Sequence, residues 1–270
     1  PYFKEKKINE IITKDVIEWQ NQLLAFRDEN RQPYSQTYLK TVHNQLSAIF
    51  NHAIRYYDLR SNPAAKAGNM GVEESKEMLF WTKEEYIKFS DAIMDKPLSF
   101  YAFELLYWCG IRVGELLALT PADFDFNKKR LTINKSYQRL KGKDLITSPK
   151  TVKSNRTIKM PQFLCGEVQE YIAMLYEIKE NERLFPVTKA YLHHEMDRGA
   201  KIAGVKRIRI HDIRHSAISL LIEMGFSALA IADRVGHESI DITYRYAHLF
   251  PNKQTEMSEK LNLEGGKRFE

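Results

Sequence analysis

Four separate segments of the chain contain the side chains best suited to phosphate chemistry. The first contains Arg112, and the third contains His211 and Arg214, which are three positions apart and would share one face of a helix. Arginine binds phosphate through paired hydrogen bonds, and histidine can exchange protons near neutral pH. Taken alone, an arginine with a nearby glutamate is more often a surface ion pair, and a histidine near an arginine is a common structural pair.

The second and fourth segments add a basic turn and two tyrosines. The turn contains Lys150 and Lys153, and taken alone it would be a charged hairpin. The fourth segment contains His237 and then Tyr244 and Tyr246. Read singly, these tyrosines would be core or interface aromatics. A site is therefore indicated only if the four segments are taken together.

Positive charge is concentrated around the basic turn. The whole chain of 270 residues has a net charge of +6, whereas residues 128–159 contain eleven basic residues and Asp144 as the one acid. A segment so uniform in sign indicates a surface that binds phosphate groups, in preference to a merely solvated hairpin. We expect the following side chains to bind the phosphate groups of a polyanionic partner: Lys128, Lys129, Arg139, Lys141, Lys143, Lys153 and Arg156.

In their order and context these residues resemble the tyrosine recombinase (phage integrase) family. The intervals of 23 positions from Arg214 to His237 and of 9 positions from His237 to Tyr246 agree with that family. Val235 stands where the family usually has leucine, at a packing position. The matching motifs are Gly-Ile-Arg112-Val-Gly-Glu-Leu, Pro-Lys150-Thr with Ser-Asn-Arg156-Thr-Ile, His211-Asp-Ile-Arg214-His, Gly236-His237 and Tyr246-Ala-His248.

The resemblance implies six catalytic residues: Arg112, Lys150, His211, Arg214, His237 and Tyr246. In the family, cationic and histidine donors hold the phosphate while the tyrosine forms a 3′-phosphotyrosyl link. This link conserves the bond energy, so we expect no cofactor, no metal ion and no ATP.

Two of these roles have alternatives within the sequence. Lys150 is expected to protonate the leaving 5′-oxygen, with Lys153 as the alternative acid. His211 is expected either to accept the proton of Tyr246 or to bind the phosphate. Tyr244 lacks the Tyr-x-His context and is not expected to be the nucleophile.

Helical periodicity predicts a small domain at the N-terminal end. Apolar residues recur at three-and-four spacing over residues 13–26, where Thr13 is a candidate cap, and over residues 35–57, where Ser35 is a candidate cap. The low hydrophobicity of residues 64–76 predicts a linker, with the domain boundary near residue 72. Domains of 1–72 and 73–270 follow, and the resemblance implies that the first is a helical core-binding DNA-binding domain.

The second domain is expected to be helical at both ends with strands between. Thr82 and Glu85 have the spacing of a capping box, and helices with a break at Gly110 are predicted as far as Leu119. Alternating or β-branched residues predict strands at 130–134, 144–147 and 156–160, and helices return from about residue 162. We expect a mainly α protein with a small antiparallel β-sheet, built as a two-domain clamp around duplex DNA.

Composition excludes several other classes of protein. The two cysteines, Cys109 and Cys165, lie in apolar patterns and cannot form a disulfide framework or a cysteine metal site, which favours a reducing compartment. No apolar run is long enough to span a bilayer. The cysteine usage leads us to expect a cytoplasmic protein, and the resemblance implies that it associates with the nucleoid. The chain begins with Pro1, which we interpret as a truncated start, and integrases of this kind carry an N-terminal arm-binding domain.

The resemblance also implies partners and rival functions. The expected partner is double-stranded DNA with a specific recombination site, bound by a homo-tetramer, with an excisionase or a host DNA-bending protein as a further partner. Integration or excision of a phage or conjugative transposon is the expected task. A type IB topoisomerase and a catalytically silent DNA-binding regulator are the alternatives. The sparse apolar residues after Tyr246 are expected to dock on a neighbouring protomer or on their own domain.

Overall fold

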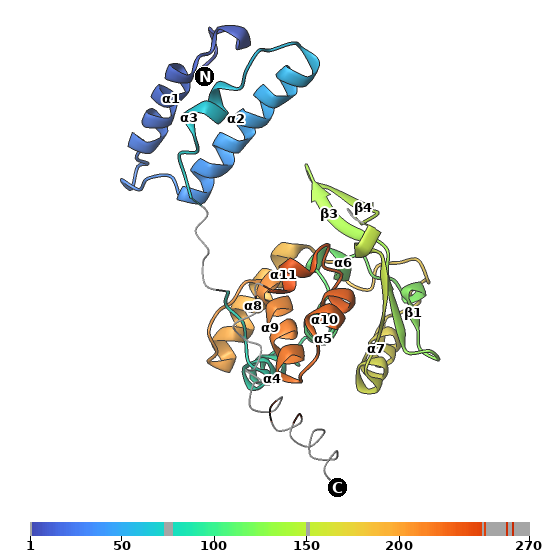
Figure 1. The fold of residues 1–270 in the computed structure, drawn as a ribbon. Helices are drawn as coiled ribbons and strands as arrows, with labels where there is room; N and C mark the ends of the chain where they lie inside the picture. Colours follow the sequence, from blue (N-terminus) through green and yellow to red (C-terminus); the bar gives the residue numbers. More distant parts are fainter. Residues whose placement is uncertain are drawn as a thin grey trace. The chain divides into compact units, whose positions relative to one another are not determined.

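A computed structural model describes residues 2–72, 78–149, 152–244, 246, 258 and 261. The chain divides into two compact units, residues 1–77 and residues 78–270 (Figure 1). The division therefore falls five residues later than the predicted boundary near residue 72. No helix in the described part of the chain is both long enough and apolar enough to cross a membrane.

In its described residues the first unit contains a short 3-10 helix (Ile8–Glu10) and three α-helices, α1 (Thr13–Ala25), α2 (Gln36–Tyr56) and α3 (Pro63–Ala67). Ser35 caps α2 as predicted, because its hydroxyl accepts a hydrogen bond from the backbone N–H of Tyr38. Thr13 is the first residue of α1 rather than its cap. The carboxylate of Asp15 instead accepts a hydrogen bond from the N–H of Ile12, at 3.0 Å.

Helix α3 contradicts the prediction that residues 64–76 form a linker. Asn62 caps this helix by accepting a hydrogen bond from the N–H of Ala65, and Pro63 provides the first helical residue. Ala64 is completely buried beside Val16 and Phe50 in the core of the unit. Low hydrophobicity was misleading here because alanine side chains are small enough to let α3 pack closely on its neighbours.

The second unit begins with α4 (Lys83–Ala92), α5 (Pro97–Cys109) and the short α6 (Val113–Leu116). The predicted capping box of Thr82 and Glu85 is present at the start of α4. Helix α5 is the centre of the core, because nine of its thirteen residues are buried, including Cys109. It ends at Gly110, whose φ of +61° lies in the left-handed region that glycine adopts without strain, so the predicted break is confirmed.

Five strands lie between the two groups of helices: β1 (Phe124–Asp125), β2 (Arg130–Ile133), β3 (Ser136–Leu140), β4 (Lys143–Thr147) and β5 (Arg156–Lys159). They form two antiparallel sheets rather than the single sheet predicted. One has the order β1-β2-β5, with Leu131 opposite Ile158 and both buried, and the other is the hairpin β3-β4. Sequence patterns found β2, β4 and β5 but did not indicate β1 or β3.

The hairpin β3-β4 projects from the second unit (Figure 1). Its two-residue turn, Lys141-Gly142, has positive φ at both positions, as the twist of the adjoining strands requires. Near its base, the guanidinium of Arg183 lies 4.1 Å from the ring centre of Tyr137. The same guanidinium pairs with Asp144, which lies closer to the turn. The base is therefore anchored, whereas every residue of β4 is exposed.

The remaining helices are α7 (Gln162–Met174), α8 (Lys189–Ala203), α9 (Ile210–Glu223), α10 (Ala228–Val235) and α11 (Ile240–Tyr244). Helices α7 and α9 both pack against α5, and α10 contacts α9 and α11. Cys165, on α7, is buried like Cys109, and both thiols are free. The C-terminal ends of α5 and α10 and the first half of α9 meet near the start of β5, and the side chains considered below lie at this junction.

Candidate active site

Arg112 lies immediately before α6 and is held at its backbone N–H and at both terminal nitrogens of its guanidinium. Glu115 accepts hydrogen bonds from the backbone N–H of Arg112 and from its Nη1, both at 2.8 Å. The other terminal nitrogen, Nη2, donates to the carbonyl oxygen of Gly236 at 3.0 Å. The side chain is 37% exposed. Arg112 is therefore fixed in direction while its guanidinium still reaches solvent.

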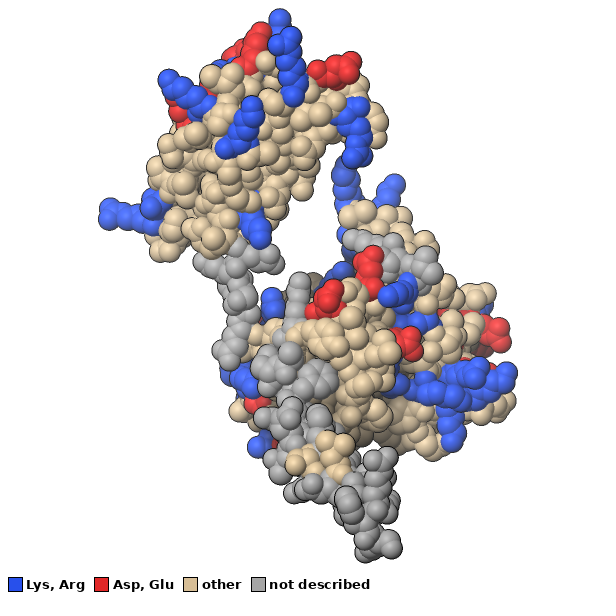
Figure 2. All heavy atoms as spheres, in the orientation of Figure 1, with Lys and Arg blue, Asp and Glu red and all other residues tan. Residues whose placement is uncertain are grey.

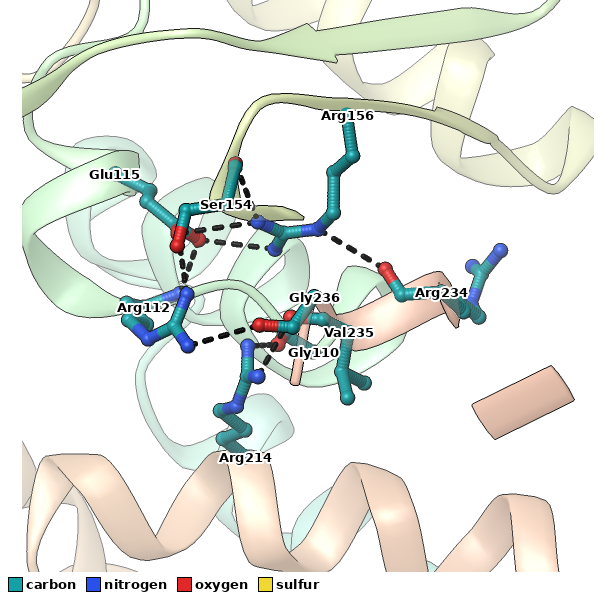
Figure 3. Close-up of polar contacts among 9 residues, drawn as sticks. All are labelled: Gly110, Arg112, Glu115, Ser154, Arg156, Arg214, Arg234, Val235 and Gly236. Carbon is teal, nitrogen blue, oxygen red and sulfur yellow. Dashed lines mark hydrogen bonds and ion pairs between the residues drawn. The ribbon is translucent and has the colours of Figure 1, made fainter. Parts of the chain in front are cut away.

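Arg214, on α9, is buried beside Arg112 (Figure 3). Its Nη1 donates to the carbonyl oxygen of Gly110 at 2.7 Å, and its Nη2 donates to that of Val235 at 2.6 Å. These carbonyls lie at the C-terminal ends of α5 and α10, where helix dipoles favour a cation. Burial, with Arg112 nearby, lowers the pKa of Arg214 to about 9, so the guanidinium stays charged at pH 7.

Arg156, at the start of β5, is directed inward. Its Nη1 and Nη2 donate to the two carboxylate oxygens of Glu115, at 3.1 Å and 3.0 Å, and its Nε donates to the carbonyl oxygen of Arg234 at 3.0 Å. The side chain is only 7% exposed. This placement differs from the expected DNA contact, because the donors of Arg156 are engaged inside the protein.

Glu115 thus joins two of the three arginines (Figure 3). Burial acts to raise the pKa of this carboxyl, but the hydrogen bonds and charges of Arg156 and Arg112 outweigh burial and hold the pKa below its usual value. Glu115 is therefore ionised at neutral pH. The three-residue spacing of Arg112 and Glu115 is that of a local ion pair, but nothing in the spacing indicated that Glu115 would also pair with Arg156.

His237 follows α10 and is held by α11. Its Nδ1 forms a 2.8 Å hydrogen bond with the hydroxyl of Thr243, and the residue is 7% exposed. Burial, together with the charges of Arg214 and Arg112, lowers the pKa of His237 to about 3. A histidine that is neutral at pH 7 keeps one ring N–H with which to donate to a phosphate oxygen.

Gly236 permits this close packing of α10 on β5. A Cβ atom at this position would lie 2.9 Å from Nη1 of Arg156, and the φ of +70° is in the left-handed region. Only glycine avoids both the close contact with Arg156 and the backbone strain of a positive φ. The Gly-His dipeptide of the motif is thus explained by the packing of Arg156 as well as by the presence of His237.

Tyr246 is 2% exposed, and its hydroxyl contacts Nδ1 of His215. The ring packs in an apolar cluster that includes Ile218 and Val235. His211, predicted to be either the proton acceptor or a phosphate ligand, is exposed and lies edge-on to His215, with the ring centres 5.0 Å apart. Sequence reasoning missed His215 because its partner is 31 positions away and no spacing rule connects them.

Lys150 lies outside the described residues, so its place in the site stays a prediction. Lys153, the alternative acid, is exposed, and its Nζ donates to the carbonyl oxygen of Glu238 at 2.8 Å. Among the described residues, no group of three or more histidine, cysteine, aspartate or glutamate side chains is arranged to hold a metal ion.

The side chains expected to contact DNA, other than Arg156, are exposed on the strands and turns of the second unit: Lys128, Lys129, Arg139, Lys141, Lys143 and Lys153. Figure 2 shows lysine and arginine side chains projecting from both units on the face in view. Arg139 also lies 3.6 Å from Asp144 in the same hairpin. These exposed side chains differ from Arg156 and Arg214, which are buried, but Lys153 lines the same cavity as Arg156 and His237.

The fold and the ordered set of arginine, histidine and tyrosine residues are those of a tyrosine recombinase. The chain belongs to the phage integrase family, whose model matches residues 69–253. It is similar to the ICEBs1 integrase of Bacillus subtilis (strain 168), with 29% identity over 276 aligned positions, 97% of this chain and 73% of that protein. The integrase of Staphylococcus phage L54a is 24% identical over 88% of this chain and 77% of its own length.

Solved structures share the fold. The Tn1549 transposon integrase in complex with a circular intermediate DNA has a TM-score of 0.73 and 20% identity, and the match covers 97% of this chain and 89% of that one. A lambda integrase dimer bound to a COC′ core site has a TM-score of 0.59 and 19% identity, covering 88% and 65%. Because the relatives are integrases and recombinases, the topoisomerase and regulator alternatives are not favoured.

Proposed function

We propose that this tyrosine recombinase cleaves and rejoins DNA at a specific site through a 3′-phosphotyrosyl intermediate, and so integrates or excises a mobile element. The observation that supports this most directly is that Arg112 and Arg214 lie side by side. Their guanidiniums donate to the carbonyls of consecutive residues, Gly236 and Val235, and His237 follows directly. The tyrosine that would attack, Tyr246, packs against Val235 in the same region.

The arrangement suits a phosphodiester better than a carboxylate substrate. Arg112 and Arg214 present donors to the two non-bridging oxygens, and neutral His237 adds a third donor. These groups are held by backbone carbonyls and Glu115 before DNA arrives, so little reorganisation is needed during the reaction. The leaving 5′-oxygen takes a proton from Lys150 in this scheme, with Lys153 as the alternative acid.

Residues 1–77 are proposed to be the core-binding domain, and the basic strands of the second unit to be its counterpart on the other side of the duplex. Four copies on two DNA sites would allow strand exchange, with an excisionase or a host bending protein setting direction. Relatives solved in complex with DNA, including the Tn1549 integrase, support the binding of DNA. The protein would act in the cytoplasm, at the nucleoid. The tail after Tyr246, proposed to dock on a neighbour, lies almost entirely outside the described residues.

The basic hairpin is expected to bind the DNA backbone without reading bases. Each lysine that neutralises a phosphate releases condensed counterions, which steepens the dependence of affinity on salt. Replacing both Lys141 and Lys143 with alanine should therefore reduce the slope of log Kd against log salt concentration by about 2. Lys179→Ala, at an exposed lysine in the loop after α7, serves as the control. An unchanged slope in the double variant would remove the hairpin from the DNA interface.

The nucleophile is tested with a Tyr246→Phe variant. On supercoiled plasmid and on a suicide substrate that carries the recombination site, wild-type protein in EDTA without ATP should form a protein-linked DNA band on a denaturing gel. Tyr246→Phe should abolish this band, because the phenylalanine ring packs similarly but has no oxygen to form the phosphodiester link. A Tyr244→Phe variant should retain it.

Binding without covalent linkage, on the cognate site and in wild-type protein, would contradict the proposal. That result would support the alternative that the protein is a catalytically silent DNA-binding regulator. A covalent adduct that relaxes plasmid but never joins two sites would instead support the topoisomerase alternative. Recombinant product from two sites would support the integrase.

A further inference from the structure

The residue that meets the nucleophile in this structure is a histidine outside the six catalytic residues implied by the family motifs. His215 lies on α9, directly after Arg214 and one helical turn after His211. Its Nδ1 contacts the hydroxyl of Tyr246, and the two ring centres are 5.6 Å apart. The side chain of His215 is 15% exposed, so the contact is largely shielded from water.

We propose that His215 is a catalytic residue that accepts the phenolic proton of Tyr246 when the tyrosine oxygen attacks the DNA phosphorus. The proposal rests on the function proposed above and assigns the proton a destination in that reaction. It also replaces the expectation that His211 accepts this proton. His211 remains available as a phosphate ligand at the exposed end of the same helix.

The second ring nitrogen of His215 has a partner that favours this role. Its Nε2 lies 3.7 Å from Oδ1 of Asp212, whose side chain is completely buried. A proton on Nε2 faces this carboxylate, which leaves Nδ1 as the acceptor for the tyrosine hydroxyl. The order tyrosine, histidine, carboxylate is the general arrangement in which a base activates a nucleophile and a third group orients the base.

The charged groups around His215 keep it neutral before DNA binds. Burial, with contributions from His211, Arg209 and Arg214, lowers the pKa of His215 to about 4, whereas Asp212 acts in the opposite direction. His237 also lies near enough for its own pKa to respond to His215. A neutral imidazole can accept a proton at pH 7, and a DNA phosphate beside it would raise its proton affinity at the moment of attack.

The proposed step is balanced in atoms and charge. The bond from Oη of Tyr246 to phosphorus forms as the bond from phosphorus to the 5′-oxygen breaks. The phenolic proton moves to Nδ1 of His215, and the 5′-oxygen takes a proton from the lysine acid. In the rejoining step the 5′-hydroxyl attacks phosphorus and gives its proton back to the now neutral lysine. The bond from phosphorus to Oη of Tyr246 breaks, and the imidazolium of His215 returns its proton to the departing tyrosine oxygen. Asp212 stabilises the imidazolium in between.

The test measures single-turnover formation of the protein-DNA adduct on a suicide substrate with two variants. His215→Ala removes the acceptor, and His215→Asn retains an oxygen that can accept a hydrogen bond but cannot take the proton. We expect both to slow adduct formation at pH 7 by at least about 100-fold, the usual contribution of a positioned base. The defect should shrink as pH rises, because the phenol then ionises without help.

A second substrate separates the base from the acid. A 5′-bridging sulfur in place of oxygen leaves without a proton, so it should restore activity when the lysine acid is lost. It should not restore the His215 variants. His193→Asn, at an exposed histidine on α8, is the matched control and should react at the wild-type rate. Thermal unfolding and DNA affinity of the variants should match the wild type, which excludes misfolding.

Three outcomes would overturn the inference. A wild-type rate for His215→Asn would reduce His215 to a positioning residue, and a rate within threefold of wild type for His215→Ala would remove it from the reaction. Full recovery on the sulfur substrate would assign it to the leaving group. The comparison of wild-type protein with Tyr246→Phe tests the proposed function separately. If wild-type protein forms no adduct, the proposed function fails. If wild-type protein forms the adduct and the His215 variants react at the wild-type rate, only the inference about His215 fails.

Discussion

Glu115→Ala is expected to lower the free energy of unfolding by about 3 to 5 kcal/mol, the usual cost of removing one partner of a buried ion pair. The side chain of Glu115 is 4% exposed and that of Arg156 is 7% exposed. Without the carboxylate, the guanidinium of Arg156 would stay buried with only the carbonyls of Ser154 and Arg234 as acceptors. Urea unfolding followed by circular dichroism measures the change.

Two further variants establish the cause of that loss. Arg156→Met combined with Glu115→Ala removes both charges, so it should recover part of the lost stability in a double-mutant cycle. In Glu115→Gln the stability deficit should narrow as pH falls. A carboxyl whose pKa is lowered in the folded state stabilises above the unfolded pKa near 4.5 and loses that contribution as pH falls through the folded pKa. Additive single effects would mean that the pair is not coupled.

Arg214→Lys is expected to slow adduct formation by about 100-fold to 1000-fold, as removal of a transition-state donor commonly does. Lysine keeps the positive charge but replaces a planar fork with a single ammonium. It cannot donate to the carbonyls of Gly110 and Val235 in their present places and also bind a phosphate through two parallel hydrogen bonds. Single-turnover rates on a suicide substrate measure the effect.

Arg234→Lys is the matched control for this prediction. The half-buried side chain of Arg234 donates to the carbonyls of Lys159 and Trp108. Arg234→Lys should change the rate of adduct formation only slightly. It tests whether replacing any arginine near α10 with lysine slows the reaction. Equal losses in the two variants would mean that Arg214 acts through the packing of α10 rather than through the phosphate.

The sequence predicted those features that depend only on residues close together in the chain. The break at Gly110 and the capping box at Thr82 depend on neighbouring residues, and both were found from sequence. Strand β3 was missed because most of its side chains are polar or half-exposed, and Tyr137 alone anchors it to the core. Helix α3 was missed because its burial depends on the close fit of Ala64 between α1 and α2.

The site shows the same distinction between local and distant information. Motif order indicated Arg112, Arg214, His237 and Tyr246, and the structure places Arg112, Arg214 and His237 around the junction of α5 and α10. The inward direction of Arg156 could not be predicted, since its acceptor is on α6, 41 positions earlier. A basic residue in a basic segment looks the same in sequence whether it faces DNA or a buried carboxylate.

The carbonyl groups that hold Arg214 have an electrostatic consequence. They solvate its charge without cancelling it, so within the cluster the guanidiniums of Arg112, Arg156 and Arg214 face a single negative charge from Glu115. The excess of two positive charges equals the double negative charge of a five-coordinate phosphorus in the transition state. Mutual repulsion among these cations therefore lowers the stability of the folded protein in the absence of DNA. The negative charge of the DNA phosphate offsets this repulsion on binding, so substrate affinity is coupled to the stability of the fold.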